Sequence, residues 1–382
     1  MTARAPKVAL VYDRVTKFGG AERVLLAISR IWPDAPLYTS VYNPRKAGWA
    51  AGLRVVPSAL DRLPFVNSSH ELFAWAMPLA FESFDLSSYD IVLSVTSAEA
   101  KHVITRPETL HICYCLTPTR YLWSGFGDYM RVPGLGPLGP LAAAGLRYLA
   151  PALRRWDLRG AAKPDRMVAI SDHVGARILR YYRRRPDAVI YPPVDLEIFR
   201  PGPRSVRKRS FYLTVGRFVG YKRLDIVVEA FNRTGLPLVV IGSGRDGGRL
   251  MKMAKKNVRF VTNDLTDKEM VHYYNQCIAL CFAGSEDFGL ISVEAQACGA
   301  PVITYSRSGM AETVIHGKTG YLFDSQSSSA LVDAVRQAGN IKFSDPMMRS
   351  NAEKFSTGRF MKEISEFTIK SFRSHRNRFG AI

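Results

Sequence analysis

Two acidic side chains, Glu286 and Glu294, lie in a stretch that joins an apolar run to a helical pattern. The spacing predicts Glu286 in the loop after a strand and Glu294 about one turn into a helix that begins near Gly289. Free amides at a helix start suit a phosphate, and carboxylates accept hydrogen bonds from sugar hydroxyls. A ligand with phosphate between two sugars fits this stretch. The alternative is a capping carboxylate beside a solvated one.

Two further turns could approach a phosphate. Arg217 and Lys222 flank the turn after the apolar run Phe211–Val215, where both cations can converge on one diphosphate. Gly19 and Gly20 follow the first apolar run of the chain, where a glycine pair lets the backbone come close to a ligand. The alternatives are a solvated basic turn and an ordinary glycine turn.

A third pattern points to a different class of enzyme. Gly242–Gly247 spells G-x-G-x-x-G after an apolar run, and Asp264 lies near the acidic position of a dinucleotide fingerprint. The pattern follows the second run of its series, whereas a dinucleotide fold carries it after the first. An NAD-dependent oxidoreductase therefore stays as an alternative. The sequence has no D-x-D pair and no metal-ligand spacing of His, Cys and carboxylates, so no metal is expected.

The elements that must position these residues are strands and helices in alternation. Short apolar runs alternate with helical stretches, which is typical of parallel sheets with crossover helices. One series runs from Val8–Tyr12 to 189–191, and a second from Phe211–Val215 to 301–305. Prolines between them indicate a domain boundary. Ligands of such sheets bind beyond the carboxyl ends of the strands, so two sheets joined by a hinge can enclose a cleft. Arg359–Arg376 predicts a closing helix.

Composition excludes several classes of protein. The 382 residues are 47% hydrophobic and 23% charged, which argues against disorder and for two domains. No apolar run is long enough to span a membrane, and the first residues lack a secretory signal, so we expect a cytoplasmic protein. The five cysteines form no paired C-x2-C sets, which indicates reduced, buried thiols.

The net charge of +20 indicates an anionic partner. Basic residues are concentrated between Gly145 and Ser210, but no nucleic-acid-binding module is recognisable, so nucleic acid is not expected. The segment 132–159 combines leucines with arginines in a pattern that can lie on an anionic membrane surface. A solvated basic helix is an equal alternative.

Together these motifs resemble the retaining glycosyltransferases of family four. The resemblance rests on Gly-Gly-Ala-Glu-Arg at 19–23, Gly-Arg-x4-Lys at 216–222 and the paired glutamates with Phe288-Gly289-Leu290. It implies two facing Rossmann-like α/β domains, the glycosyltransferase B-type fold. We expect an acceptor-side domain over 1–192, a donor nucleotide-sugar domain over 193–355, and a crossing helix and tail over 356–382 that pack on the first domain.

Two stretches, 110–121 and 189–195, are similar to bacterial mannosyltransferases that build exopolysaccharide or O-antigen (lipopolysaccharide) repeats on a lipid diphosphate. This resemblance implies GDP-mannose as donor and a lipid-linked or glycan acceptor. The enzyme is then expected in the cytoplasm, with docking on the inner face of the membrane as an open possibility.

The resemblance also implies roles for single residues. Arg217 and Lys222 would hold the diphosphate and neutralise its charge as it leaves. Glu286 would bind hydroxyls of the transferred sugar and Glu294 those of the ribose. Backbone amides near Phe288, Gly289 and Leu290 would bind the distal phosphate. The amides of Gly19 and Gly20 would bind phosphate from the other domain. The resemblance implies retention of stereochemistry without a protein nucleophile. No cofactor or metal is expected beside the nucleotide-sugar.

One residue departs from the subgroup. The subgroup has a histidine before the Thr-Pro that ends its strand, and this chain has Leu116. His111 lies too far along the same extended segment to replace it. A catalytically impaired homologue with a binding or scaffolding role is therefore the non-enzyme alternative.

Overall fold

The computed structural model describes residues 4–63, 66, 73, 75–131, 139–203 and 209–379. The chain divides into two compact units, Met1–Tyr191 with Phe360–Ile382, and Pro192–Arg359. The first break lies at Tyr191, within the proline-rich stretch that indicated a boundary in the sequence. The last helix belongs to the first unit by its contacts, so the chain returns to the unit in which it began.

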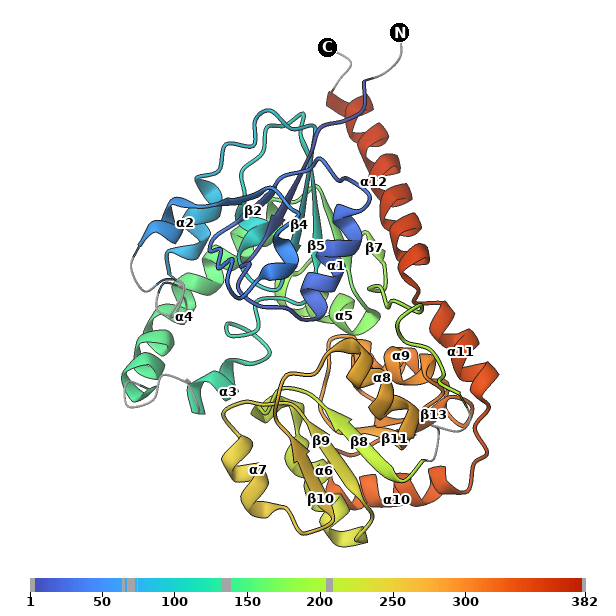
Figure 1. Cartoon of the computed structure of the whole chain (residues 1–382). Coiled ribbons are helices and arrows are strands. Elements are labelled where there is room, and N and C mark those ends of the chain that lie inside the picture. Colours follow the sequence, from blue (N-terminus) through green and yellow to red (C-terminus); the bar gives the residue numbers. More distant parts are fainter. Residues whose placement is uncertain are drawn as a thin grey trace. The chain divides into compact units, whose positions relative to one another are not determined.

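The first unit is built on a parallel sheet. Figure 1 shows this sheet with helices around it. Its strand order is β3-β2-β1-β4-β5-β6-β7. The three central strands are buried along their whole length, as expected for a sheet covered on both faces. The strands are β1 (Val8–Tyr12), β2 (Leu37–Thr39), β3 (Val55–Pro57), β4 (Ile91–Thr96), β5 (Leu110–Cys115), β6 (Arg166–Ala169) and β7 (Ala188–Val189).

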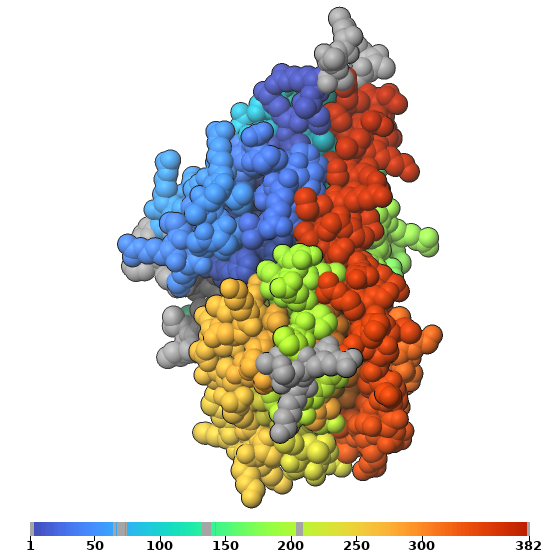
Figure 2. Space-filling model, turned by 45° about the vertical axis from the view of Figure 1, so that its right-hand side comes forward, coloured from blue at the N-terminus to red at the C-terminus, as the bar shows by residue number. Residues whose placement is uncertain are grey.

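Several α-helices accompany this sheet. They are α1 (Gly20–Ser29), α2 (Met77–Glu82), α3 (Phe126–Arg131), α4 (Gly139–Ala162), α5 (Asp172–Tyr182) and α12 (Thr357–Phe379). Helix α12 buries Phe360, Ile364 and His375 on one face, and the Phe360 ring packs edge-on against Tyr114 of β5. Figure 2 shows the red surface of this helix lying against the blue surface of the first unit.

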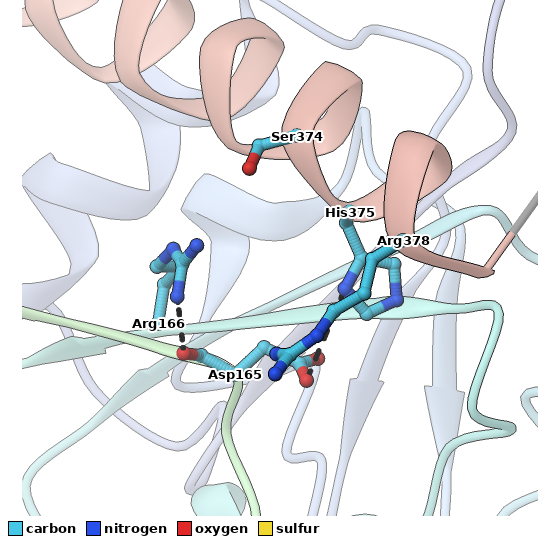
Figure 3. Close-up of a pocket in the computed structure, with 5 residues that line it drawn as sticks. All are labelled: Asp165, Arg166, Ser374, His375 and Arg378. Atoms are coloured by element: carbon cyan, nitrogen blue, oxygen red, sulfur yellow. Dashed lines mark hydrogen bonds and ion pairs between the residues drawn. The ribbon is translucent and has the colours of Figure 1, made fainter.

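The far end of α12 is tied to the amino edge of the sheet. His375 Nε2 donates to the carbonyl of Pro107 at 2.8 Å, and its Nδ1 lies 4.0 Å from the carboxylate of Asp165, which precedes β6. Figure 3 shows His375 and Asp165 in the lining of a small cavity of about 230 Å³. The other lining residues are Arg166, Ser374 and Arg378. This cavity lies at the amino ends of the strands, away from the edge where parallel sheets bind ligands.

A buried ion pair fixes α4 to the core of the first unit. Lys101 Nζ lies 2.6 Å from the carboxylate of Asp157 of α4, and both side chains are almost completely buried. Asp157 also accepts the hydroxyl of Thr119 and the indole N–H of Trp123, both at 2.7 Å. Burial opposes the charge of Lys101, but Asp157 outweighs it and raises the pKa of the lysine. Asp157 therefore joins α4 to the loop after β5.

The second unit repeats the architecture around a six-stranded parallel sheet of order β10-β9-β8-β11-β12-β13. Its strands are β8 (Phe211–Val215), β9 (Leu238–Ile241), β10 (Val258–Val261), β11 (Cys277–Phe282), β12 (Val302–Tyr305) and β13 (Gly320–Phe323). Its helices are α6 (Leu224–Thr234), α7 (Gly247–Met253), α8 (Asp267–Gln276), α9 (Leu290–Ala297), α10 (Ser328–Gly339) and α11 (Asp345–Glu353).

Several sequence expectations can be compared with these elements. The closing helix is longer than predicted, and β3 and β13 were not predicted at all. All five cysteines are buried free thiols. Part of the predicted amphipathic segment, 132–138, lies outside the described residues; the rest forms α4. Over the described part of the chain, no helix combines the length and the apolar composition needed to cross a bilayer.

The Lys101–Asp157 pair yields a stability prediction. Lys101→Met leaves the Asp157 carboxylate buried without its cation and should lower the free energy of unfolding by about 3–5 kcal/mol. Lys46→Met, at an exposed position of the same unit, should change it by less than about 0.5 kcal/mol. All five tryptophans belong to the first unit, so urea unfolding followed by tryptophan fluorescence measures this unit. Equal midpoints for the two variants would contradict the assignment.

Candidate functional site

An ion pair joins two of the residues singled out in the sequence. Lys222 Nζ contacts the carboxylate of Glu286, and the two side chains are 15% and 13% exposed. The ammonium group also lies 5.5 Å from the centre of the Phe282 ring and 5.8 Å from that of Tyr221. The pair is therefore partly shielded from water but still reachable, so its charges are felt more strongly than those of a surface pair.

The backbone brings these two side chains together. Lys222 ends the short 3-10 helix Gly220–Lys222 after β8, and Gly284 follows the neighbouring strand β11. A Cβ atom added to Gly284 would lie 2.6 Å from the carbonyl oxygen of Lys222 and 2.9 Å from its Cα. Only glycine permits this approach of two backbone segments. Without it, Glu286 would not reach Lys222.

A second loop holds Glu286 from the other side. The backbone N–H of Glu286 donates to the hydroxyl of Ser308 at 2.9 Å, and its carbonyl accepts the N–H of Gly309 at 2.9 Å. Ser308 and Gly309 follow β12. Three successive carboxyl ends, those of β8, β11 and β12, thus converge on one carboxylate, as expected for the ligand-binding edge of a parallel sheet.

Helix α9 begins four residues after Glu286. Its N-cap is Gly289, with φ 88°, and Leu290 is the first helical residue. The Phe288 ring is buried against Phe355, with ring centres 5.6 Å apart, so Phe288 offers the site its backbone and not its side chain. The amino end of α9 points the positive end of its dipole at this loop. This arrangement suits an anionic group.

Glu294 stands one turn into α9 and is buried. Its Oε2 accepts the hydroxyl of Tyr274 of α8 at 2.8 Å. Burial, followed by the neighbouring carboxylate, raises the pKa of Tyr274, so the phenol stays protonated and donates. The phenol therefore orients this carboxylate. The alternative of a solvated Glu294 is wrong.

Arg217 is more exposed than Lys222, although both lie in the β8–α6 loop. Its guanidinium is exposed, and one of its nitrogens donates to the hydroxyl of Tyr221 at 2.8 Å. Tyr221 also presents its ring to Lys222, so this single tyrosine contacts both cations.

Gly19 and Gly20 belong to the first unit, where Gly19 is the N-cap of α1 and Gly20 its first residue. The carboxylate of Glu22 is buried at this helix start and accepts the hydroxyl of Tyr12 at 2.6 Å. Burial raises the pKa of Glu22, although hydrogen bonds from Tyr12 and from backbone N–H groups partly oppose the shift. Glu22 was not proposed as a site residue from the sequence. Its carboxylate accepts backbone N–H groups at the start of α1, so fewer of these N–H groups remain for a ligand.

The glycines of the G-x-G-x-x-G pattern have a packing role. A Cβ on Gly242 would lie 2.1 Å from the carbonyl oxygen of Gly216, and a Cβ on Gly244 2.6 Å from that of Phe218. Phe218 N–H donates to the carbonyl of Ser243 at 2.8 Å. The pattern therefore allows the β9–α7 loop to pack on the loop that carries Arg217. This packing accounts for Gly242 and Gly244 without a dinucleotide.

The described residues include no group of three or more His, Cys, Asp or Glu side chains placed to share a metal ion.

Residues 196–355 match the model of the family described as glycosyl transferases group 1. The match lies within the second unit. A curated relative, D-inositol 3-phosphate glycosyltransferase of Mycobacterium marinum (strain ATCC BAA-535 / M), is 26% identical over 329 residues, which cover 78% of this chain and 66% of that protein. D-inositol 3-phosphate glycosyltransferase 2 of Catenulispora acidiphila is 30% identical over 188 residues, 41% of this chain and 44% of the relative. These alignments span less than two thirds of the relatives' length.

Solved structures extend the similarity in fold to both units. The apo form of lipopolysaccharide outer core galactosyltransferase WaaB is similar with a TM-score of 0.65 and 18% identity, covering 96% of this chain and 99% of that one. Anabaena Alr3699/HepE in complex with UDP and glucose is similar with a TM-score of 0.69 and 17% identity, covering 96% and 100%. The predicted fold class, two Rossmann-like α/β domains of the glycosyltransferase B-type fold, is confirmed.

Several residues of the second unit escaped the sequence reasoning. Gly284, Tyr274, Ser308 and Tyr221 position the predicted side chains, yet none has a spacing that marks it. A signal existed for Gly284, because a glycine directly after a buried strand often allows a close backbone approach. Tyr274 could be found only once α8 was known to pack against α9.

The close approach at Gly284 gives a prediction. Gly284→Ala forces the backbone at Lys222 to move and should destabilise the second unit by about 1–3 kcal/mol, lowering its melting temperature by several degrees in calorimetry. Gly248→Ala is the matched control, because a Cβ there meets nothing within 4 Å. It should be neutral or slightly stabilising. A Gly284→Ala variant as stable as the control would show that the approach is not required.

Proposed function

We propose that the chain is a retaining glycosyltransferase that moves a sugar from a nucleotide-sugar to an acceptor in cell-surface glycan synthesis. The observation that carries the proposal is the Lys222–Glu286 ion pair at the amino end of α9, with buried Glu294 one turn further on. The cation and the helix start suit the phosphates of such a donor, and the two carboxylates suit the hydroxyls of its two sugars. The family match of residues 196–355 supports the same class.

Each residue then has a role in binding the donor. Lys222 and Arg217 hold the diphosphate, and backbone amides near Phe288, Gly289 and Leu290 hold its distal phosphate. Glu286 accepts hydroxyls of the transferred sugar, because a carboxylate paired with one lysine keeps further lone pairs. In the same proposal Glu294 binds the ribose hydroxyls, and Gly19 and Gly20 offer backbone amides to a phosphate.

The chemistry is stabilisation of a leaving diphosphate. As the bond between the sugar and the phosphate breaks, negative charge grows on the phosphate oxygens next to Lys222 and Arg217. The acceptor hydroxyl attacks from the side of the leaving group and gives its proton to the departing phosphate, so the configuration is retained. The positive charge comes from side chains, and the proposal includes no metal and no cofactor beside the nucleotide-sugar.

For the donor we propose GDP-mannose, and for the acceptor a lipid-linked or polysaccharide glycan, as in exopolysaccharide or O-antigen assembly. This makes the chain a mannosyltransferase. The similarity of 110–121 and 189–195 to such enzymes supports it. UDP-sugars are the competing donors, since a similar structure contains UDP and glucose. The two D-inositol 3-phosphate glycosyltransferases give a third acceptor class to test.

A thermal-shift panel of GDP, UDP, NAD and an oligonucleotide tests the binding class. We expect GDP to raise the melting temperature and the oligonucleotide to leave it unchanged. Glu294→Ala should weaken GDP binding about tenfold or more, because the ribose loses a charged acceptor. Glu229→Ala, at an exposed position of α6, is the matched control and should bind normally. Stabilisation by NAD alone would overturn the transferase proposal.

Turnover is tested with GDP-mannose and other sugar nucleotides, by hydrolysis or by transfer to membrane lipid. Lys222→Ala should lose mainly rate, because its interaction grows in the transition state. Unchanged kinetics in both Lys222→Ala and Glu294→Ala would refute the site.

A second candidate is a catalytically impaired homologue with a binding or scaffolding role. The observation that favours it is Leu116, a buried residue with no titratable group, after β5. Stabilisation by GDP without turnover of any sugar nucleotide would support this candidate.

We also propose that α4 docks the protein on the inner face of an anionic membrane. Leu141 and Tyr148 are 73% and 86% exposed, and the exposed residues of the helix include Arg147, Arg155 and Arg159. The one acidic residue of α4, Asp157, is buried. An exposed face that is apolar and basic complements anionic lipid.

Flotation with vesicles containing anionic lipid tests this surface. Arg155→Glu with Arg159→Glu should reduce binding about tenfold or more, because each basic residue near the surface contributes about 1 kcal/mol. Arg45→Glu with Lys46→Glu changes the net charge equally at exposed positions outside α4 and should bind as wild type does. Equal losses in the two pairs, or binding that salt does not weaken, would remove the proposal.

A further inference from the structure

The carboxyl edge of the first sheet carries a polar cluster that the donor site does not use. The loops after three neighbouring strands contribute to it: Asp13 and Arg14 follow β1, Glu99 follows β4, and Tyr121 follows β5. Ligands of parallel sheets bind at this edge, so the cluster lies where a ligand of the first unit is expected.

Asp13 fixes the loop on which Glu99 stands. Its buried carboxylate accepts the hydroxyl of Thr96 at 2.7 Å and the backbone N–H groups of Ser97 and Ala100 at 2.7 and 2.9 Å. Because its carboxylate makes these hydrogen bonds, we assign Asp13 a structural role. It sets the position of the neighbouring residue Glu99 before any ligand arrives.

Glu99 in turn holds Arg14. One carboxylate oxygen lies 2.5 Å from Arg14 Nη2, and the other accepts the hydroxyl of Tyr121 at 2.8 Å. The Glu99 side chain is 3% exposed, whereas that of Arg14 is 22% exposed. Glu99 is therefore a positioning residue, and Arg14 is the member of the pair that a ligand can reach.

The Arg14 guanidinium has unused donor capacity. Its Nε–H is shielded from solvent and has no acceptor among the described residues, which is rare for a buried donor. An Arg presents five N–H donors in a planar fork, and Glu99 occupies one side of it. The exposed part of the guanidinium, in a side chain that is 22% exposed, can donate to an oxygen atom from outside the protein.

The charge around Arg14 selects the kind of oxygen. The carboxylates of Asp13 and Glu99 outnumber the single guanidinium, so a phosphate or carboxylate would meet net repulsion. A hydroxyl or ring oxygen accepts from Arg14 without adding charge. The ring of Tyr121, packed edge-on to Tyr129 with centres 6.3 Å apart, supplies an aromatic surface beside it. The guanidinium N–H groups can donate to sugar oxygens, and the aromatic rings can pack against the sugar ring.

We propose that Arg14, held by Glu99, binds an uncharged sugar ring of the acceptor and contributes to acceptor specificity. This inference rests on the proposed transferase function, since it assigns an acceptor subsite for that reaction. It adds to that proposal a class of acceptor: a saccharide whose terminal residue is neutral.

Saturation-transfer NMR tests the subsite with a mixture of the methyl α-glycosides of mannose, glucose and galactose, and with inorganic phosphate as competitor. We expect at least one glycoside to bind the wild-type protein and phosphate not to displace it. Arg14→Met should weaken this binding about tenfold or more. Arg14→Lys keeps the charge that Glu99 needs, so it should fold, but it lacks the planar fork and should bind almost as weakly.

Arg45→Met, at an exposed position of the same unit, is the matched control and should bind as wild type does. No glycoside binding to the wild-type protein, or unchanged binding in Arg14→Met, would overturn the inference. Displacement by phosphate, or full recovery in Arg14→Lys, would identify an anion site instead and also overturn it.

Nucleotide binding separates this inference from the proposed function. The Arg14 variants should keep the wild-type thermal shift with GDP, because Arg14 is not among the residues that we propose for donor binding. If the wild-type protein binds no nucleotide, the proposed function fails whatever the glycosides do. If nucleotide binds normally and the Arg14 variants bind the glycosides as the wild-type protein does, only the proposal of the acceptor subsite fails.

Discussion

The contact between Lys222 and Glu286 is the interaction on which the candidate site depends. Opposite charges brought together in a half-buried place lose hydration, and the pair persists because the backbone fixes both partners. Gly284 allows the segments after β8 and β11 to touch, and Ser308 holds Glu286 from the loop after β12. The site is thus a product of sheet order: three strand ends that are adjacent in space but far apart in sequence meet at one carboxylate.

The first unit uses the same principle with different residues. Asp13 organises the loop after β4, Glu99 stands on that loop, and Glu99 orients Arg14. Behind this edge, Asp157 binds the loop after β5 to α4, the helix whose outer face is apolar and basic. The surface that we propose for membrane docking and the edge that we propose for the acceptor are therefore connected through buried polar bonds within one unit.

Much of the fold could be predicted from the sequence, because buried parallel strands appear as short apolar runs. β1 and β8 match their predicted bounds. β3 and β13 were missed because they are short edge strands that are only partly buried, so their apolar signal is weak. In the site, the spacing of Glu286 and Glu294 was informative, since it fixes one residue in a loop and the other on a helix. The bond between Tyr274 and Glu294 could not be predicted, because it depends on how α8 packs against α9.

The central claim is that Lys222 and Glu286 act as one unit on the bond between sugar and diphosphate. A double-mutant cycle on the rate of sugar-nucleotide hydrolysis tests it most directly, with Lys222→Met, Glu286→Gln and the double variant. We predict that each single change slows the reaction and that the double variant is little slower than the slower single one. Losses that simply multiply, or a single variant as fast as the wild-type protein, would contradict the account.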